Sequence, residues 1–380
     1  MPSIAAFDSE IPSLICTFAW AIRERATSPR RRRRPEKIAR ILVAPHLRLG
    51  DALLVTPLLA KLRMRYPHAE IVLLSTLPML PLYQARPYGV TIWPYHPRRF
   101  ATVTAMMANK GFDLAILPGD NRHAWLALAL DAKWIVAHSG DRPRIKNWPV
   151  DEFIDYPDTP MAMGEIFAEL IPGEPPAPFT PGDWPKPAHT PFDLPGKPYA
   201  LLHAGASSAV KFWPAAHWRA LAQRLTERGY DVVWSCGPGE HKLLAEVSAS
   251  HSTKTYPGTL DLAQMWHLIA GAALFISPDT GVAHLARLTG TPSVVLFGPG
   301  SPMLFGRGRF WQNTPSREVA VPDMHCRDQG HVFNRHRSWI KRCGRTPRQC
   351  VNGISCMNGI VPAMVESAID SLTISVRHVG

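Results

Sequence analysis

The stretch over residues 274–302 constrains the fold most, because two short apolar runs flank a segment with a helix start signal. The apolar runs cover residues 274–277 and 293–298, and the segment between them begins with Asp279-Thr280-Gly281. This order predicts a strand, a turn, a helix and a second strand of a parallel sheet. Such a unit places a helix N-terminus at the carboxyl end of a strand, where phosphates and sugar hydroxyls bind. An ordinary capped helix without a ligand is the alternative interpretation.

A comparable unit of strand, loop, helix and strand is predicted after the run of arginines at residues 30–34. Residues 38–43 predict a strand, a loop with Gly50 and Asp51 follows, and residues 54–66 carry a helical apolar stripe before a strand at 70–74. The loop lacks the GxGxxG fingerprint of dinucleotide-binding proteins. Further strands are predicted at 90–93, 114–117 and 134–137, with a helix at 124–130. The first half therefore predicts one α/β domain.

A second α/β domain is predicted to begin with a strand at residues 199–203. The loop after it contains Ser207, Ser208 and Lys211, a helix covers 215–228, and a strand at 231–235 runs into a turn with Glu240. A helix at 261–270 then leads into the stretch described first. The stretch at 157–198 is rich in proline, which is typical of a semi-rigid linker. We therefore expect two Rossmann-like doubly wound domains whose strand ends face a central cleft.

The expected division of the chain has four parts. Residues 1–36 form a basic N-terminal segment, 37–190 the first domain with the linker at its end, and 191–323 the second domain. Residues 324–380 form a segment rich in cysteine and arginine, with a final helix at 361–369 that we expect to return to the first domain.

The net charge of +12 favours an anionic partner. Five consecutive arginines at 30–34 follow apolar residues spaced as in a helix over 11–22, which predicts an amphipathic contact with an anionic membrane. A leader without structure and a helix packed on the protein's own surface remain alternatives. Aromatic residues do not alternate with basic ones as in nucleic-acid-binding motifs, so nucleic acid is not an expected partner.

Four of the six cysteines follow the pattern C-x16-C-x6-C-x5-C at Cys326, Cys343, Cys350 and Cys356. This spacing lacks the paired C-x2-C of strong zinc sites, so either a structural zinc or iron ion or four reduced thiols fit it. The isolated Cys16 and Cys236 do not suggest a secreted disulfide framework, and we expect a cytoplasmic protein. Seven basic residues in this segment predict either contact with an anionic acceptor or a solvated surface: Arg327, Arg335, Arg337, Lys341, Arg342, Arg345 and Arg348.

Three motifs in order, RLGDALLVTPLL, KFWPAAHW and SPDTGVAHLARLTGTPSVVLFGPGSP, resemble glycosyltransferase family 9, the ADP-heptose:lipopolysaccharide heptosyltransferases. The resemblance covers about residues 38–315. It implies GT-B architecture, with the acceptor bound by the first domain and the nucleotide sugar by the second. The implied reaction is an inverting, metal-independent transfer of heptose from ADP-L-glycero-D-manno-heptose to a lipopolysaccharide-core or related acceptor. The implied location is peripheral, on the cytoplasmic face of the bacterial inner membrane. The autotransporter heptosyltransferases, which have an iron-binding finger, are similar in the cysteine region.

The resemblance also implies roles for single residues. The catalytic base falls on Asp51 and the phosphate-contacting lysine on Lys211. Donor binding falls on Asp279, Thr280, Gly281 and His284, and Glu240 is expected to contact the adenosine. The hydroxyl groups of Ser207 and Ser208 suit the same donor site. Arg48 and Gly50 are expected near the acceptor. Each has a structural alternative: Asp51 as a helix cap, Lys211 as a solvated lysine, His284 as a core histidine.

Two other functions stay open. Within the enzyme class, the chain could be a family member that uses another sugar nucleotide or glycosylates a protein. Outside that class, it could be an inactive scaffold that binds a sugar nucleotide. The joint presence of Asp51, Lys211 and the Asp279-Thr280-Gly281 turn favours the enzyme.

Overall fold

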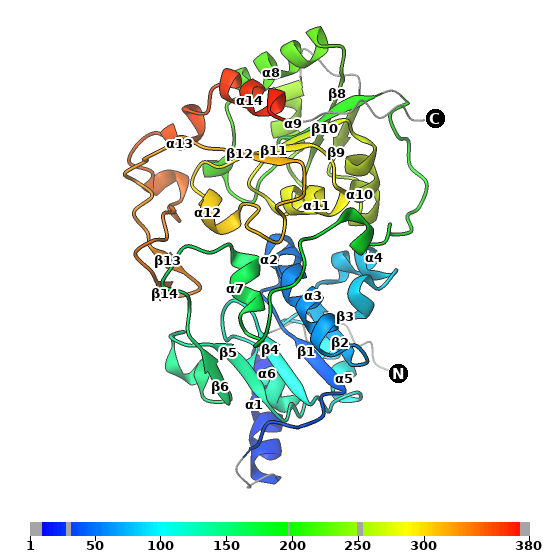
Figure 1. The fold of residues 1–380 in the computed structure, drawn as a ribbon, viewed down its shortest axis with the longest axis vertical. Coiled ribbons are helices and arrows are strands. Elements are labelled where there is room, and N and C mark those ends of the chain that lie inside the picture. The colour runs from blue at the N-terminus through cyan, green and yellow to red at the C-terminus, as the bar shows by residue number, and fades with distance from the viewer. Residues whose placement is uncertain (1–9, 28–31, 197, 249–253, 373–380) are drawn as a thin grey trace. The chain divides into compact units, whose positions relative to one another are not determined.

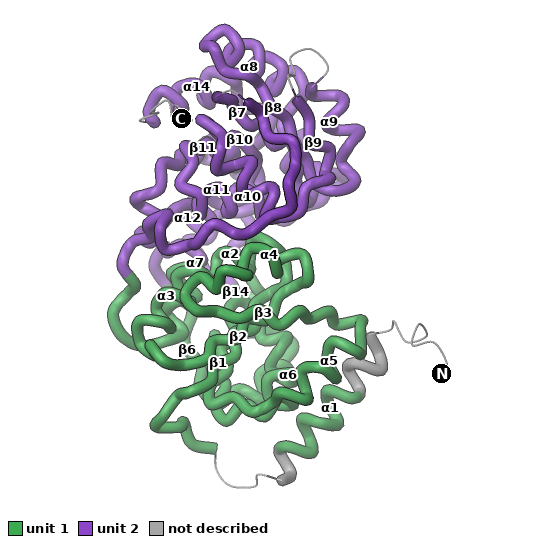
Figure 2. The backbone as a smooth tube through the Cα atoms, turned by 90° about the vertical axis from the view of Figure 1, so that its right-hand side faces the viewer, with its two compact units in different colours: residues 1–157, 164–176, 332–335 green, residues 158–163, 177–331, 336–380 purple. Residues whose placement is uncertain are grey.

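The computed structural model describes residues 10–27, 32–196, 198–248 and 254–372 (Figure 1). The chain forms two compact units (Figure 2). Unit 1 comprises Met1–Pro157, Gly164–Pro176 and Val332–Arg335, and unit 2 comprises Asp158–Met163, Ala177–His331 and His336–Gly380. Before the hairpin residues 332–335, the last residue of unit 1 is Pro176, within the proline-rich stretch and before the expected boundary at residue 190. The cysteine-rich segment is part of unit 2, except for the four residues 332–335.

Unit 1 is built on a six-stranded parallel sheet in the order β3-β2-β1-β4-β5-β6. The strands are β1 (Arg40–Val43), β2 (Glu70–Ser75), β3 (Val90–Pro94), β4 (Leu114–Leu117), β5 (Ile135–His138) and β6 (Glu152–Ile154). Helices α2 (Leu49–Leu54), α3 (Thr56–Arg65), α4 (Leu80–Tyr83), α5 (Phe100–Met107), α6 (Ala124–Ala129) and α7 (Met163–Ala168) connect and cover them. The order reverses between β1 and β4, and ligands of such sheets bind beyond the strand ends at this point.

Unit 2 repeats this arrangement in the order β12-β11-β10-β7-β8-β9, also parallel. The strands are β7 (Tyr199–His203), β8 (Asp231–Cys236), β9 (Lys254–Pro257), β10 (Leu274–Pro278), β11 (Ser293–Leu296) and β12 (Ser316–Val319). The helices are α8 (Ala215–Glu227), α9 (His241–Ser248), α10 (Leu262–Gly271), α11 (Gly281–Thr289), α12 (Pro302–Phe305), α13 (Ser355–Asn358) and α14 (Pro362–Asp370). The reversal lies between β7 and β10. The strand, turn, helix and strand predicted for residues 274–302 are confirmed as β10, α11 and β11.

Short elements complete the chain. A two-stranded hairpin consists of β13 (His331–Val332) and β14 (Arg335–His336). The 3-10 helices are η1 (Leu77–Met79), η2 (Pro87–Gly89), η3 (Arg144–Asn147), η4 (Pro181–Asp183), η5 (Ala209–Lys211) and η6 (Pro347–Gln349). The helix predicted over 54–66 instead forms α2 and α3, which meet at Val55. Pro57 explains the interruption, because proline fits the first turn of α3 but cannot donate within a continuous helix.

The final helix does not return to unit 1 as predicted from the sequence. Helix α14 packs in unit 2, where Val365 and Ile369 are buried in the same apolar cluster as Trp218 and Trp234. Arg228, the C-cap residue of α8, donates to Asp370 at 2.8 Å, and a second ion pair joins Arg224 to Glu366. Helix α14 contacts α8, β11 and β12, and burial of its apolar side chains against these elements explains its position.

Helix α1 (Glu10–Thr27) packs on unit 1. The Phe18 ring stacks on Trp125 with centroids 4.3 Å apart, and Ala21 is fully buried. After the helix, Arg32 lies 3.2 Å from the Asp151 carboxylate. The structure thus shows the alternative in which this helix covers the protein's own surface; its side chains at 10–15 and 25–27 lie outside the described residues. In the described ranges, none of the helices combines the length and apolar character needed to span a membrane.

Candidate active site

Asp51 lies beside the order reversal of the unit 1 sheet. Helix α2 starts directly after the loop that follows β1, and Asp51 occupies its first turn. The cap position belongs to Arg48, an exposed residue, so the structure does not show Asp51 as the cap. Its Oδ2 atom lies 3.3 Å from Nδ1 of His46, but the alignment of the two groups is not that of a hydrogen bond. Catalytic contacts are often poorly aligned before substrate binds, so this pair can orient a base.

His46 is a neutral imidazole at physiological pH. Burial, followed by the positive charge of Arg122, lowers the pKa of His46 to about 4. A neutral ring can hydrogen-bond to the Asp51 carboxylate without neutralising its charge. His46 thus leaves Asp51 able to accept a proton. The resemblance did not indicate His46; its position directly after a buried strand is the signal that could have found it.

Asp120 and Arg122 follow β4, the other strand at the reversal. Arg122 Nε donates to both carboxylate oxygens of Asp120 at 2.8 and 2.9 Å, and Nη2 donates to Oδ2 at 2.7 Å. Although burial opposes ionisation, these bonds hold the pKa of Asp120 below its ordinary value. Asp51 is among the charges that raise the Arg122 pKa. This ion pair, which none of the three motifs includes, places a guanidinium near the Asp51 loop.

The tip of the β13–β14 hairpin completes this part of unit 1. Phe333 and Asn334 both have positive φ, at 46° and 63°, as a tight turn requires. The Phe333 ring lies over Gly119, where an added Cβ atom would come within 3.3 Å of it. It also approaches His46, with the ring centroids 6.3 Å apart. The tip therefore shapes the surroundings of the Asp51 loop.

Arg335 of this hairpin is buried, which corrects the prediction that it faces an acceptor or solvent. Its guanidinium donates to the carbonyl oxygens of Gly119, His138 and Ser139 at 2.6 to 2.8 Å. It also donates to Asn121 Oδ1 at 3.2 Å. These acceptors belong to the loops after β4 and β5, so Arg335 fixes the two loops together.

Lys211 lies beside the order reversal of the unit 2 sheet, as Asp51 does in unit 1. It lies at the end of the loop after β7, and its Nζ donates to the carbonyl oxygen of Asp279 at 2.6 Å and to Asp279 Oδ2 at 3.0 Å. Asp279 follows β10, so this contact bridges the two strands at the order reversal. Thr280 is the cap residue of α11, and its buried hydroxyl finds no hydrogen-bond partner among the described residues. A cation beside free helix N–H groups is suited to a diphosphate.

Glu240 connects the loops after β7 and β8. Its Oε1 accepts from the backbone N–H of Ala206 at 3.0 Å, and Oε2 accepts from that of Gly237 at 2.7 Å. Gly205 is required at this contact, because a Cβ atom there would lie 2.0 Å from Glu240 Oε2. Ser207 is exposed and Ser208 half-buried in the same loop. The structure therefore brings Ser207, Ser208 and Lys211 together on one loop that Glu240 holds.

His284 lies one turn into α11 and is buried. Its Nδ1 atom lies 3.1 Å from Nη1 of Arg287, which also donates to the carbonyl oxygens of Phe305 and Gly306. Burial, and then the charge of Arg287, lower the pKa of His284 to about 3. These contacts are those of a structural histidine, and the assignment of His284 to donor binding stays a prediction.

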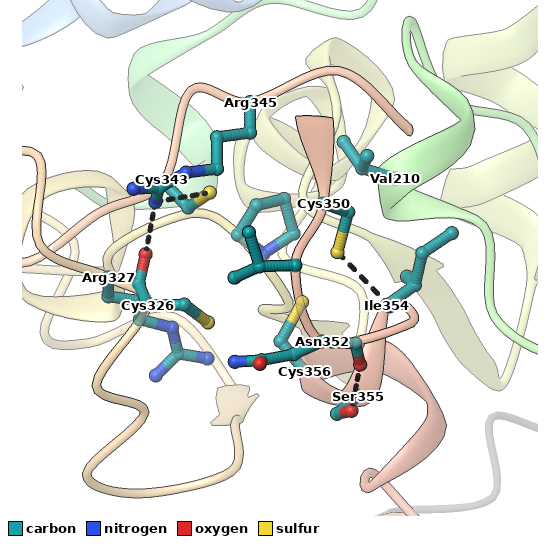
Figure 3. A pocket seen from close by; sticks show the side chains of 12 residues that line it. Val210, Cys326, Arg327, Cys343, Arg345, Cys350, Asn352, Ile354, Ser355 and Cys356 are labelled. Carbon is teal, nitrogen blue, oxygen red and sulfur yellow. Dashed lines mark hydrogen bonds between the residues drawn. The ribbon is translucent and has the colours of Figure 1, made fainter. Parts of the chain in front are cut away.

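The four clustered cysteines line one cavity of unit 2 (Figure 3). In the part of the chain that the structure describes, no three histidine, cysteine or acidic side chains already lie at metal-binding spacing. Arg327 beside them is buried and donates to the carbonyl oxygens of Phe297, Gly298 and Val321. The prediction that Arg327 faces an acceptor is therefore wrong; it is held by carbonyl groups at the end of β11 and beyond β12.

Two doubly wound parallel six-stranded sheets in one chain define the GT-B class of glycosyltransferase fold. Within that class, the chain belongs to glycosyltransferase family 9 (heptosyltransferase), whose sequence model matches residues 106–333. The resemblance stated from the motifs is thereby confirmed.

Two curated relatives and one solved structure show the extent of this similarity. The chain is 36% identical over 113 residues to lipopolysaccharide heptosyltransferase 1 of Pseudomonas aeruginosa, which covers 30% of this chain and 32% of that protein. It is 25% identical over 295 residues to lipopolysaccharide heptosyltransferase 3 of Escherichia coli, covering 70% and 84%. The structure of E. coli ADP-heptose lps heptosyltransferase II superposes with a TM-score of 0.64 at 20% identity, over 87% of this chain and 97% of that one. The structural likeness confirms the fold.

Proposed function

We propose that this protein is an inverting, metal-independent heptosyltransferase. Its donor is ADP-L-glycero-D-manno-heptose and its acceptor a lipopolysaccharide core or related surface glycan. The observation that carries the proposal is the Lys211–Asp279 contact at the order reversal of unit 2, next to the N-terminus of α11. The printed names of its relatives, lipopolysaccharide heptosyltransferases, support the donor and the acceptor class.

Asp51 is the proposed base. It takes the proton of the acceptor hydroxyl while that oxygen forms a bond to the anomeric carbon of the heptose. The bond from the anomeric carbon to the diphosphate breaks at the same time, so ADP leaves and the configuration inverts. The contact with neutral His46 orients the carboxylate without competing for the proton, since burial lowers the pKa of that imidazole to about 4.

Unit 2 is proposed to stabilise the leaving diphosphate. The Lys211 ammonium and the backbone N–H groups of Thr280 and Gly281 supply positive charge where negative charge develops. Ser207 and Ser208 add hydroxyl donors from the same loop. Asp279 would repel a phosphate, so we assign its remaining acceptor capacity to heptose hydroxyls and its contact with Lys211 to orienting the ammonium.

Glu240 is proposed to bind the adenosine side of the donor. Each carboxylate oxygen accepts one backbone N–H and retains lone pairs for a ribose hydroxyl. On unit 1, exposed Arg48 and the Arg122 guanidinium are positioned to bind an anionic acceptor near Gly50. A lipid-linked acceptor requires work at a membrane, and we propose a peripheral location on the cytoplasmic face of the inner membrane.

A transfer assay tests the proposal. The purified protein is incubated with ADP-L-glycero-D-manno-heptose and heptose-deficient lipopolysaccharide, and ADP release and acceptor mass are followed. We expect ADP in step with a mass gain of one heptose. Transfer from another sugar nucleotide alone, or onto protein alone, would contradict the stated donor or acceptor. Donor binding without ADP release would indicate an inactive scaffold.

A further inference from the structure

The loop between β5 and β6 places apolar and basic side chains on the surface of unit 1 (Figure 1). We call residues 142–148, which contain the 3-10 helix η3, the η3 surface. Ile145 and Trp148 are 54% and 51% exposed, and Arg142 and Arg144 are exposed beside them in the chain. We propose that the η3 surface binds a membrane of anionic phospholipids. This inference rests on the proposed function, since a lipid-linked acceptor is what brings unit 1 to a bilayer.

The η3 surface has a rigid base. Trp125 of α6 donates from Nε1 to the carbonyl oxygen of Ile145 at 2.9 Å. The Trp125 ring also stacks on that of Trp148, with the centroids 5.1 Å and the planes 8° apart, and on the ring of Phe18 at 4.3 Å. Trp148 is therefore exposed in a fixed orientation. Because the surface is ordered before it binds, contact with a partner costs little conformational entropy.

A buried carboxylate joins the η3 surface to the loop that contains Arg122. The Asp141 side chain is fully buried, and its Oδ2 accepts from the backbone N–H of Asn121 at 2.7 Å. Its Oδ1 accepts from the backbone N–H of Arg142 at 2.6 Å. Asn121 in turn donates from Nδ2 to Asn147 Oδ1 at 2.8 Å. The η3 surface is thus fixed to the loop after β4, next to the guanidinium proposed to bind the acceptor.

The charge of the η3 surface suits lipid phosphates. Arg142, Arg144 and Lys146 provide three positive charges, and residues 142–148 contain no acidic side chain. Lys146 is partly engaged, because its Nζ lies 3.6 Å from the buried Asp141 carboxylate. The guanidinium groups of Arg142 and Arg144 form no ion pair with any described residue. Each such cation near an anionic bilayer strengthens its attraction to the protein severalfold.

The combination of side chains favours a bilayer over other partners. Tryptophan prefers the boundary between lipid headgroups and acyl chains, and an aliphatic side chain is buried there as well. A sugar could stack on Trp148 but would gain nothing from Ile145. A second copy of this chain, related by a two-fold axis, would bring the same arginines together, and they would repel each other. Anionic lipids satisfy both the apolar and the basic side chains.

Sedimentation with lipid vesicles tests the proposal in the absence of donor and acceptor. The full-length protein is mixed with vesicles of phosphatidylethanolamine and phosphatidylglycerol, or with vesicles of phosphatidylcholine alone. We expect binding to the anionic vesicles that weakens as salt is added, and little binding to the neutral ones. Arg144→Gln combined with Ile145→Ser should lower the partition coefficient for anionic vesicles at least about tenfold.

A second pair of neighbours provides the matched control. Met64 and Arg65 are also an exposed apolar and an exposed basic residue, at the end of α3 and outside the η3 surface. Met64→Ser combined with Arg65→Gln should bind vesicles as the wild type does. If the η3 variant does not fold, as judged by circular dichroism, Arg142→Gln combined with Arg144→Gln replaces only exposed side chains and should weaken binding about tenfold.

Transfer assays separate this proposal from the proposed function. The η3 variant should transfer several-fold more slowly to an acceptor embedded in vesicles, and as fast as the wild type to an acceptor dispersed in detergent. Vesicle binding that the variant loses, in a protein without transferase activity, would support the η3 surface and contradict the proposed function. Transfer without vesicle binding, equal binding to neutral vesicles, unchanged binding in the variant, or an equal loss of transfer in detergent would each overturn the η3 surface as a membrane contact.

Discussion

At the scale of single residues, close backbone packing decides what the donor loops tolerate. Gly205 lies against Glu240 so tightly that no side chain fits, and the carboxylate in turn holds the loop after β7 to the loop after β8. Glycine is needed here for space and not for an unusual φ. Glu240 can thus hold the proposed donor loop only because residue 205 has no side chain.

Gly205→Ala should therefore displace Glu240 and weaken donor binding. Forcing a methyl group into this contact costs about 1 to 3 kcal/mol of stability. We expect the dissociation constant for ADP, measured by calorimetry, to rise at least about tenfold. Gly182→Ala is a matched control in unit 2, because a Cβ atom there meets nothing within 4 Å. Equal ADP affinity in both variants would remove Glu240 from the donor site.

Buried histidines predict how stability depends on pH. Burial lowers the pKa of His203 to about 4, whereas an unfolded histidine titrates near 6.5. Between these values the unfolded chain binds a proton that the folded chain does not, so stability falls as the pH drops from 6.5 towards 4. His46, His123, His138 and His284 shift in the same direction.

Urea unfolding at several pH values measures this effect. We expect the free energy of unfolding to decrease steadily from pH 7 to pH 4.5. His203→Gln should flatten the decrease, while substitution of exposed His68 should leave the slope unchanged. If the free energy of unfolding depends on pH equally in the wild type, His203→Gln and the His68 variant, the assignment of His203 as a neutral buried histidine is contradicted.

Motifs could predict some of these residues and not others. Asp51, Lys211, Glu240 and Asp279 each lie within a recognisable loop after a predicted strand. Arg122 was missed because it approaches the Asp51 loop only through the strand order of the sheet, which brings β1 beside β4. His46 lies in the same loop as Asp51, but no motif marks it. The burial of Arg327 and Arg335 was also unpredictable, since charge alone does not reveal which backbone carbonyls will surround a side chain.

At the scale of elements, the β13–β14 hairpin supports the loops after β4 and β5. It supplies Phe333 over Gly119 and the buried Arg335 that bonds to the loops after β4 and β5. The loop after β4 contains Asp120 and Arg122, so the hairpin supports the surroundings of the proposed base. Its contacts explain why residues 332–335 belong to unit 1 although the flanking chain belongs to unit 2.

Arg335→Lys should loosen these loops without disturbing the donor loop. Lysine keeps the charge but cannot reach several carbonyl groups in fixed geometry, and we expect a loss of about 2 kcal/mol of stability. The KM for the acceptor should rise while ADP affinity stays unchanged. Arg337→Lys is the control, because Arg337 contacts the exposed carboxylate of Asp158 and the carbonyl oxygen of the neighbouring His336. Unchanged stability and KM in Arg335→Lys would contradict the role of the hairpin.

Elements were more predictable than single contacts. The strands β4, β7, β8 and β10 appear within a residue of their expected ends, because fully buried parallel strands are short continuous apolar runs. Helices α1 and α14 were predicted as helices, but the partner of an apolar face depends on surfaces that form only when the chain folds. For this reason the prediction that the last helix packs on unit 1 was wrong. For the same reason the sequence left several alternatives for the surface that α1 contacts.

At the scale of the whole molecule, two units of the same topology carry different chemistry at equivalent positions. The order reversal of unit 1 presents a carboxylate beside a neutral histidine, and that of unit 2 presents a lysine beside a helix N-terminus. One fold thus provides a proposed base in one unit and a proposed diphosphate site in the other. The central claim is this division of work between the units.

Comparison of Asp51→Asn with Lys211→Ala tests that claim most directly. The rate of heptose transfer from ADP-heptose and the dissociation constant for ADP are measured for both variants. We predict that Asp51→Asn lowers kcat by about 10²- to 10⁴-fold with ADP affinity unchanged, because only the base is lost. Lys211→Ala should weaken ADP binding as well as transfer. Near-normal turnover in Asp51→Asn, or unchanged ADP affinity in Lys211→Ala, would contradict the account.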